Sequence, residues 1–390
     1  LVDLYAIANA IFGCETLVLE RHDVRRITIP CYNGYPNKLI QKLTALFQLV
    51  LDRPVEVTLG ENKEPFLFTF MGDRPLASNY TCLFSTGIDS YSAILNAHEK
   101  LKMVRGAFVS HRDFRKLKGL CNQFSDHLDG ENGIRIDKID AIDHGQFIRR
   151  SRGAFYLIYG LMLENKNVIM GEAGVTMYQP KLTLLDSVTI TAHPALLGLV
   201  SDVVGIVLGE RPNLILPCEN MTKAEVVSNC HDDAWIKKTF SCSGTTRFAT
   251  EAGAANCGTC FSCIIRRLAV EVSGKQDCKY AFDITSDTSR KAYDNILHLL
   301  HFSLGMLSDR EAIHWYTMEI LERYNKVDLF ERFAMDNLAG LMLMSDAGKL
   351  NNVLAKMRDI SVHRVDDSML RERIEVVRNY QVMMDFSKAI

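Results

Sequence analysis

A single segment, Thr81-Cys82-Leu83-Phe84-Ser85-Thr86-Gly87-Ile88-Asp89-Ser90, sets the expected architecture of this chain. It consists of a short apolar run, a turn rich in serine, threonine and glycine, and the start of a helical pattern. Such a turn directs several backbone N–H groups at one point, and the dipole of the following helix adds partial positive charge there. The segment therefore predicts a strand, an anion-binding loop and a helix in succession.

From Thr81 onward, short apolar runs alternate with longer segments of helical periodicity, which is typical of β-α-β units. Strands are expected at 81–84, 104–109, 134–139, 168–171 and 213–216, with helices at 90–102, 114–128, 147–165 and 192–208. Thr222-Lys223-Ala224-Glu225 matches a capping box and predicts another helix start. The fold class that follows is α/β, with a doubly wound parallel sheet.

Additions are expected at both ends, because 390 residues exceed one comfortable core. The N-terminal part predicts a small α+β domain with strands at 25–32, 55–59 and 65–70, a helix at 37–51 and a boundary turn at 72–75. After about residue 279 the pattern is all helical, at 293–304, 308–325, 329–344, 350–358 and 368–386, with a second capping box at Ser308 and Glu311. The expected domains are 1–76, 77–279 and 280–390.

The anion-binding loop contains six candidate nucleotide-binding residues: Ser85, Thr86, Gly87, Ile88, Asp89 and Ser90. Glycine lets the backbone approach a phosphate closely, the serine hydroxyls can donate hydrogen bonds, and Asp89 can hold the loop or a magnesium ion. The run Gly-x-x-x-x-Gly-Lys-Ser/Thr is absent, which excludes the usual mononucleotide P-loop. The alternative is a serine-rich turn that merely caps a helix.

Four of the 11 cysteines have the spacing of a metal site: Cys242, Cys257, Cys260 and Cys263. Four thiolates complete a tetrahedron around zinc at about 2.3 Å, and such a closed site is structural. A redox dithiol of Cys257 and Cys260 is the alternative, but it leaves the other two cysteines without a purpose. We expect the remaining seven to be small buried hydrophobes in a reducing compartment: Cys14, Cys31, Cys82, Cys121, Cys218, Cys230 and Cys278.

Net charge and hydropathy limit the kinds of partner that we expect for this chain. A formal charge of -2 gives no overall field to gather nucleic acid, so nucleic acid is not expected as a partner. No apolar run approaches the roughly 20 residues needed to cross a bilayer, and the first residues lack the basic start of a signal peptide, so we expect a cytoplasmic protein. Local basic clusters remain candidate anion contacts: Arg149, Arg150, Arg152, Arg266 and Arg267.

Ser85-Thr86-Gly87-Ile88-Asp89-Ser90 resembles the motif Ser-Gly-Gly-x-Asp-Ser of the PP-loop ATP pyrophosphatases, with threonine at the second position. The resemblance implies cleavage of ATP between the α and β phosphates, with transfer of AMP to a substrate oxygen. A Cβ at position 86 takes room where glycine takes none, so the turn is expected to differ there.

Two stretches of this chain resemble the end of the sequences of the QueC family, the 7-cyano-7-deazaguanine synthases. They are Ser241-Cys242-Ser243-Gly244 and Cys257-Gly258-Thr259-Cys260-Phe261-Ser262-Cys263-Ile264-Ile265-Arg266-Arg267. Arg152, Gly171, Pro217 and Thr222-Lys223-Ala224-Glu225-Val226-Val227 agree in order. The similarity covers about residues 81–273. Ser110-His111-Arg112 and Thr191-Ala192-His193-Pro194 depart from the family, which leaves the substrate contacts open.

This resemblance implies ATP, Mg2+ and a structural zinc ion, with Asp89, Lys223 and Arg152 as catalytic candidates. Lys223 would offset charge on pyrophosphate and Arg152 would hold an anionic group, although surface ion pairs are the alternative. The substrate-binding candidates are Ser110, His111, Gly171, Glu172 and His193. The two histidines could accept a proton from an amine, but a lone histidine is more often structural.

The substrate implied is a 7-carboxy-7-deazaguanine-like molecule, and the open question is the nucleophile. Enlarged QueC-like proteins of antiphage systems, such as QatC and the type IV CBASS relative, imply a partner protein whose N-terminal amine is the acceptor, and we favour this hypothesis. The alternatives are nitrile synthesis from ammonia and a degenerate nucleotide-binding scaffold. A PP-loop enzyme of tRNA thiolation or lysidine formation would need a basic RNA-binding face that the net charge does not supply.

Overall fold

The computed structural model describes residues 2–20, 26–61, 79–110, 115–140, 150–163, 166–179, 190–242, 256–282, 284, 290–348, 366–379 and 384–389. Among them is a five-stranded sheet in the order β5-β4-β3-β6-β7, and every described pairing in it is parallel. Its strands are β3 (Tyr80–Leu83), β4 (Val104–Ser110), β5 (Ile136–Asp140), β6 (Asn167–Met170) and β7 (Asn213–Ile215). The prediction of an α/β fold with a parallel sheet is confirmed.

Strand β3 occupies the centre of this sheet and pairs with β4 on one side and β6 on the other. The strand order therefore reverses at β3, so the loops that follow β3 and β6 leave the carboxyl edge of the sheet next to each other. Ligands of open α/β sheets bind at such a switch point. The loop that begins at Ser85 lies at this position.

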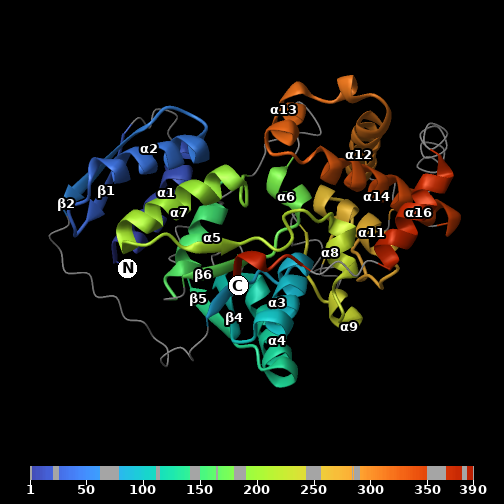
Figure 1. The fold of residues 1–390 in the computed structure, drawn as a ribbon, viewed down its shortest axis with the longest axis horizontal. Helices are drawn as coiled ribbons and strands as arrows, with labels where there is room; N and C mark the ends of the chain where they lie inside the picture. The colour runs from blue at the N-terminus through green and yellow to red at the C-terminus, as the bar shows by residue number, and fades with distance from the viewer. Residues whose placement is uncertain are drawn as a thin grey trace.

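Helices cover both faces of the sheet, as right-handed crossovers require. Helices α3 (Ile88–Leu101) and α4 (Arg115–Asn132) lie on one side, and α5 (Arg152–Leu161) lies on the other, where α7 (Pro194–Leu208) packs against it (Figure 1). Gly160 allows α5 to approach β3 closely, because a Cβ there would lie 2.5 Å from the Leu83 side chain.

The N-terminal unit consists of α1 (Val2–Glu20), β1 (Arg26–Cys31), α2 (Asn37–Leu51) and β2 (Glu56–Glu61), with β1 and β2 paired in parallel. Helix α2 has the predicted bounds, because its apolar residues recur every three or four positions and bury one face against α7: Leu39, Leu43, Leu46, Phe47 and Val50. Helix α1 was not predicted. The expected strand at 65–70 and turn at 72–75 lie outside the described residues.

The C-terminal helices are α12 (Arg290–Ser308), α13 (Trp315–Arg323), α14 (Val327–Asp346) and α16 (Asp367–Arg378), with short 3-10 turns η2 (Arg310–Ala312) and η3 (Ser387–Ala389). Helix α14 packs against α11 (Phe261–Ser273), and Gly340 permits this contact because a Cβ there would lie 2.9 Å from the Leu268 backbone. The C-terminal helices therefore share a core with the sheet-bearing part. The expected helix at 350–358 lies outside the described residues.

The second predicted capping box is wrong. Ser308 is the last residue of α12, and its hydroxyl donates to the Leu304 carbonyl oxygen at 2.7 Å. The turn that follows has Asp309 at its N-cap and no side-chain capping bond. The reason is that α12 stays helical one turn further than its apolar pattern suggested.

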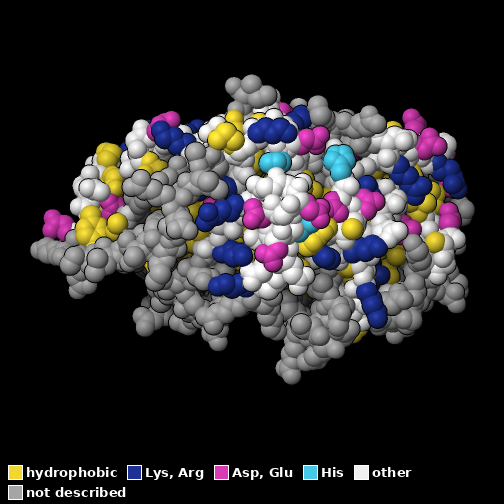
Figure 2. Space-filling model, turned by 90° about the horizontal axis from the view of Figure 1, so that it is seen from below, with side chains coloured by type: hydrophobic (Ala, Val, Ile, Leu, Met, Phe, Trp, Pro, Cys, Tyr) yellow, Lys and Arg dark blue, Asp and Glu magenta, His cyan; other side chains and the backbone are white. Residues whose placement is uncertain are grey.

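Helix hydropathy and surface charge are relevant to the expected partners of this chain. None of the helices in the described ranges has both the length and the apolar character for a bilayer crossing. On the face seen in Figure 2, acidic and basic side chains of the described residues are interspersed rather than separated by sign.

Candidate active site and metal centre

The loop between β3 and α3 places uncapped N–H groups at the switch point. Gly87 is the N-cap of α3 and supplies no side-chain hydrogen bond, so the first N–H groups of α3 are available to a ligand. The Ser90 hydroxyl instead holds the loop together: it accepts from the Ser85 N–H at 3.1 Å and donates to the Gly87 carbonyl oxygen at 3.0 Å. Ser85 is exposed, and its Oγ lies 3.2 Å from the Ser90 Oγ. The loop has the features of an anion site.

Thr86 has the unusual backbone in this loop. Its φ is 61°, in the left-handed region, and its side chain is fully buried. Its Oγ1 has no hydrogen-bond partner among the described residues. A β-branched residue is strained in this conformation, so the departure from glycine at this position has a conformational cost.

We expect Thr86→Gly to be more stable than Thr86→Ala by about 1 kcal/mol, because only glycine adopts this φ without strain. Denaturant unfolding of the two variants measures the difference. The matched pair is Gln123→Gly and Gln123→Ala on the exposed side of α4, where alanine should be the more stable by about 1 kcal/mol. The same order at both positions would contradict the strain argument.

Asp89, Lys223, Glu172 and Arg152 come together beside the loop. The Lys223 ammonium donates to Asp89 Oδ2 at 2.6 Å, and these side chains are only 13% and 10% exposed. Asp89 Oδ1 is buried without a hydrogen-bond partner among the described residues. Burial raises the pKa of Glu172 and the charge of Asp89 raises it further, while Lys223 and Arg152 lower it. Three predicted catalytic residues and one predicted substrate residue therefore share one electrostatic environment.

Glu172 has a pH-dependent effect on stability whose sign follows from its raised pKa. When the pKa of a carboxyl is higher in the folded than in the unfolded state, its protonated form contributes full stability at pH values below the unfolded-state pKa. This contribution is lost as the pH rises through the folded-state pKa. Glu172→Gln should therefore increase the free energy of unfolding more at about pH 8 than at about pH 5. Glu99→Gln, at an exposed position of α3, is the control. An equal effect of Glu172→Gln at both pH values would contradict the prediction.

Residues 239–242, here called the strap, connect the loop to the cysteines. The Phe240 N–H donates to the Thr86 carbonyl oxygen at 2.9 Å. On one side of Phe240, Arg266 donates to the Thr239 carbonyl oxygen at 3.1 Å and, on the other, to Ser241 Oγ at 3.2 Å. Asn256 Oδ1 accepts from the Ser241 N–H at 2.9 Å. The strap therefore holds the backbone of the strained residue in the loop.

The prediction that Arg266 contacts a bound anion is wrong. Its side chain is fully buried, forms an ion pair with Asp277 at 2.9 Å and donates to the Thr239 and Ile236 carbonyl oxygens, so it points into the protein and not to a bound anion. Arg267 also contacts the protein: its Nη2 donates to the Phe282 carbonyl oxygen at 2.7 Å, and its guanidinium lies 3.7 Å from the Tyr280 ring centroid. Arg149 lies outside the described residues.

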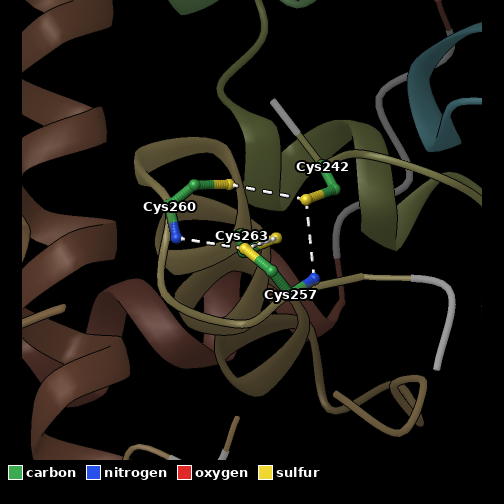
Figure 3. A group of neighbouring side chains, drawn as sticks. All are labelled: Cys242, Cys257, Cys260 and Cys263. Atoms are coloured by element: carbon green, nitrogen blue, oxygen red, sulfur yellow. Dashed lines mark hydrogen bonds between the residues drawn. The ribbon is translucent and has the colours of Figure 1, made fainter. Parts of the chain in front are cut away.

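Four cysteines gather at the end of the strap and the start of α11 (Figure 3). The Sγ atoms of Cys242 and Cys260 are 3.9 Å apart, as are those of Cys257 and Cys263, and all four lie within 4.8 Å of one another. A zinc ion bound at about 2.3 Å gives sulfur–sulfur edges of about 3.8 Å. The Cys260 N–H also points to Cys257 Sγ at 3.4 Å, as suits a thiolate. The cluster could hold a metal ion such as zinc.

Most other cysteines behave as predicted. Among the described side chains, five are buried: Cys31, Cys82, Cys121, Cys218 and Cys230. Cys278 is only partly buried, and its sulfur accepts from Asn256 Nδ2 at 3.3 Å. The Cys14 side chain lies outside the described ones.

The remaining predicted substrate-binding residues lie on different elements: Ser110 ends β4, Gly171 follows β6 and His193 precedes α7. Gly171 has a packing role, because a Cβ there would lie 2.3 Å from the Ala93 Cβ. His193 caps α7 by accepting from the Ala195 N–H at 3.2 Å, and burial lowers its pKa. His111 lies outside the described residues. The structure therefore places His193 in a structural role.

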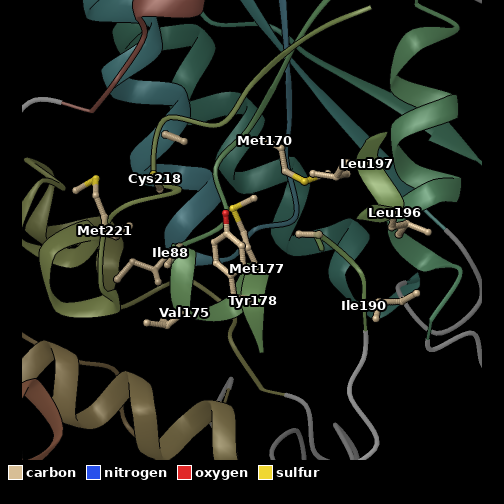
Figure 4. Close-up of a cluster of buried hydrophobic side chains, with 14 of the residues drawn as sticks. Ile88, Met170, Val175, Met177, Tyr178, Ile190, Leu196, Leu197, Cys218 and Met221 are labelled. Carbon is tan, nitrogen blue, oxygen red and sulfur yellow. The ribbon is translucent and has the colours of Figure 1, made fainter. Parts of the chain in front are cut away.

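The segments that carry Asp89, Glu172 and Lys223 are anchored by buried apolar side chains. Ile88, Met170 and Cys218 belong to the segments that carry Asp89, Glu172 and Lys223, and they are part of one buried cluster with Tyr178 of α6 (Gly174–Tyr178) (Figure 4). This packing fixes the backbone that carries the site.

Sequence reasoning missed the strap and the aromatic cluster of Tyr178, His193 and Tyr324, in which the His193 and Tyr324 ring centroids lie 5.5 Å apart. The one available signal was the spacing of Arg266, one helical turn after Cys263. No model of a known protein family matches this chain, and the search of curated proteins found no match.

Proposed function

We propose that this chain is an ATP-dependent, adenylating carbon–nitrogen ligase of the PP-loop ATP pyrophosphatase type. One observation carries the proposal: the uncapped N-terminus of α3 lies beside the buried Lys223–Asp89 ion pair at the switch point of the sheet. Backbone N–H groups bind phosphate, and a nearby lysine offsets the charge that develops on a leaving pyrophosphate. A turn that merely caps a helix gives no reason to bury this ion pair.

In the proposed reaction, a carboxylate oxygen attacks the α-phosphorus of ATP, and the bond to the bridging oxygen breaks to release pyrophosphate. An amine nitrogen then attacks the acyl carbon, AMP leaves with the electron pair of the broken C–O bond, and the nitrogen loses its proton to solvent. The loop binds the phosphates, Lys223 stabilises pyrophosphate, and Arg152 holds an anionic group. Asp89 Oδ1, which is buried and unpartnered among the described residues, is the oxygen that would bind Mg2+.

The proposed metal at the cysteine cluster is zinc in a structural role. Four sulfur atoms leave no open coordination position, so the ion would fasten the strap to α11 rather than take part in the chemistry. The same arrangement disfavours a redox dithiol, because all four sulfurs point to one centre (Figure 3).

The proposed substrate is a 7-carboxy-7-deazaguanine-like acid, and the proposed nucleophile is the N-terminal amine of a partner protein. The acid comes from the motifs that resemble the QueC family. The nucleophile comes from the additions at both ends of the chain, which resemble the enlarged QueC-like proteins of antiphage systems. Ammonia as the nucleophile and nucleotide binding without chemistry remain the competing hypotheses.

One experiment separates these hypotheses. The protein is incubated with ATP, Mg2+ and 7-carboxy-7-deazaguanine, with either ammonium or a candidate partner protein, and pyrophosphate and product masses are measured. Acid-dependent pyrophosphate release with a deazaguanine-sized mass added to the partner supports the proposal. A nitrile product supports the ammonia-dependent synthase. Bound nucleotide without pyrophosphate release, with every acceptor, would overturn the enzymatic function.

A further inference from the structure

Glu225 links the C-terminal helices to the helix that carries Lys223. Its side chain is completely buried in α8 (Lys223–Ser228). One carboxylate oxygen, Oε2, accepts from the Thr222 N–H at 2.8 Å and closes the predicted capping box. The other, Oε1, accepts from Arg373 of α16 at 2.6 Å and from Arg332 of α14. The first turn of α8 is therefore bound to two helices that lie more than 100 residues further along the chain.

The charges in this contact balance within a buried network. Arg373 also donates to Asp336 Oδ1 at 2.7 Å, so two buried carboxylates face two guanidinium groups, and the exposed Asp328 also pairs with Arg332 at 3.2 Å. The side chains of Glu225, Asp336 and Arg373 are 0%, 4% and 5% exposed. A buried carboxylate that loses its partner is strongly destabilising. The observed position of Glu225 therefore depends on the C-terminal helices.

The turn that precedes α8 is held by the same helices. Arg332 Nη2 donates to the Asn220 carbonyl oxygen at 2.9 Å, and Lys326 Nζ lies 3.3 Å from Glu219 Oε1. This turn is followed by the capping residue Thr222, and Lys223 is the first residue of α8. Residues on both sides of Lys223 in the sequence are therefore held by the C-terminal part of the chain.

We propose that Arg332 and Arg373 are positioning residues, which hold Glu225 and the first turn of α8 so that Lys223 faces Asp89 and the anion loop. The inference rests on the proposed function, because that function gives Lys223 its task. It also gives the C-terminal helices a part in building the active site, in addition to any contact with a partner.

Arg332→Gln tests the inference, because Arg332 is partly exposed and Arg373 remains to balance Glu225. We expect kcat for pyrophosphate release to fall about tenfold while the KM for ATP changes less than about threefold, because the loop still binds the ground state. Arg332→Lys should restore part of kcat, since a lysine can reach Glu225 but not Asn220 at the same time. Arg310→Gln, which breaks an exposed ion pair between η2 and Glu331 of α14, is the control and should have wild-type kcat.

A double-mutant cycle shows whether Arg332 acts through Lys223. In the Lys223→Met background, Arg332→Gln should change kcat less than about twofold. A kcat within twofold of wild type for the single variant, or an undiminished loss in the Lys223→Met background, would overturn the inference.

Acylation of lysines, followed by peptide mass spectrometry, reads the position of Lys223 without using activity. Arg332→Gln should raise the labelling rate of Lys223 about fivefold relative to the exposed Lys166, because the ion pair with Asp89 opens more often. An unchanged rate would contradict the positioning role. Wild-type protein that releases no pyrophosphate would instead overturn the proposed function, so the two failures are distinct.

Discussion

Cys260→Ser should abolish binding of the proposed zinc ion, lower the midpoint of thermal unfolding by about 10 °C or more and weaken the proposed binding of ATP at least about tenfold. The physical reason is the strap. Without the metal, Cys242 no longer anchors residues 239–242, and the hydrogen bond from the Phe240 N–H to the Thr86 carbonyl oxygen loses its support. Elemental analysis, thermal unfolding and nucleotide titration measure the three effects.

Cys278→Ser is the matched control for this prediction. Cys278 lies next to Asn256 but outside the four-cysteine cluster, so the variant should keep its metal and its affinity for ATP. Metal removal with a strong chelator should reproduce the effects of Cys260→Ser in the wild-type chain. Full metal content in Cys260→Ser, or unchanged ATP affinity after metal removal, would refute the proposed coupling between cluster and loop.

Lys223→Met should reduce kcat for pyrophosphate release by about 100- to 1000-fold, with a smaller effect on the KM for ATP. Charge accumulates on pyrophosphate in the transition state, so the ammonium contributes most there. Asp89→Asn should also reduce kcat, because it removes the partner that holds Lys223 at 2.6 Å and the proposed Mg2+ ligand. Steady-state kinetics with the acid substrate measures both variants.

Stability must be measured beside activity for these variants, because each leaves one member of a nearly buried ion pair without its partner. Assays are therefore made well below the unfolding midpoint. Lys166→Met is the control, since it breaks an exposed ion pair with Glu210 and should leave kcat unchanged. Wild-type kcat in folded Lys223→Met would rule out the proposed role of this lysine.

Much of the secondary structure could be predicted because its signals are local. The predicted strand at 104–109 corresponds to β4, and helix α2 has the predicted bounds at both ends. The capping box at Thr222 is present with both of its hydrogen bonds. The box at Ser308 failed because the same residue types also occur inside a helix, where a serine hydroxyl can bond to the carbonyl four residues back.

The candidate site was predictable in its parts but not in its connections. The loop, the four cysteines and Lys223 each belong to a short motif. Arg266 was a candidate anion contact because nothing in its sequence neighbourhood shows that its side chain is buried. The arginines that reach Glu225 had no signal at all, since their partner lies 107 and 148 residues away.

Short-range patterns in the amino-acid sequence were sufficient for the parallel α/β sheet, the turn between β3 and α3 and the cysteine cluster, because strand, turn and thiol spacings involve only a few neighbouring residues. Folding alone settled that Asp89 meets Lys223 across 134 residues, that the strap joins the cysteines to Thr86, and that the C-terminal helices reach α8. Such contacts depend on how distant elements bury their apolar faces together, and no local pattern encodes them.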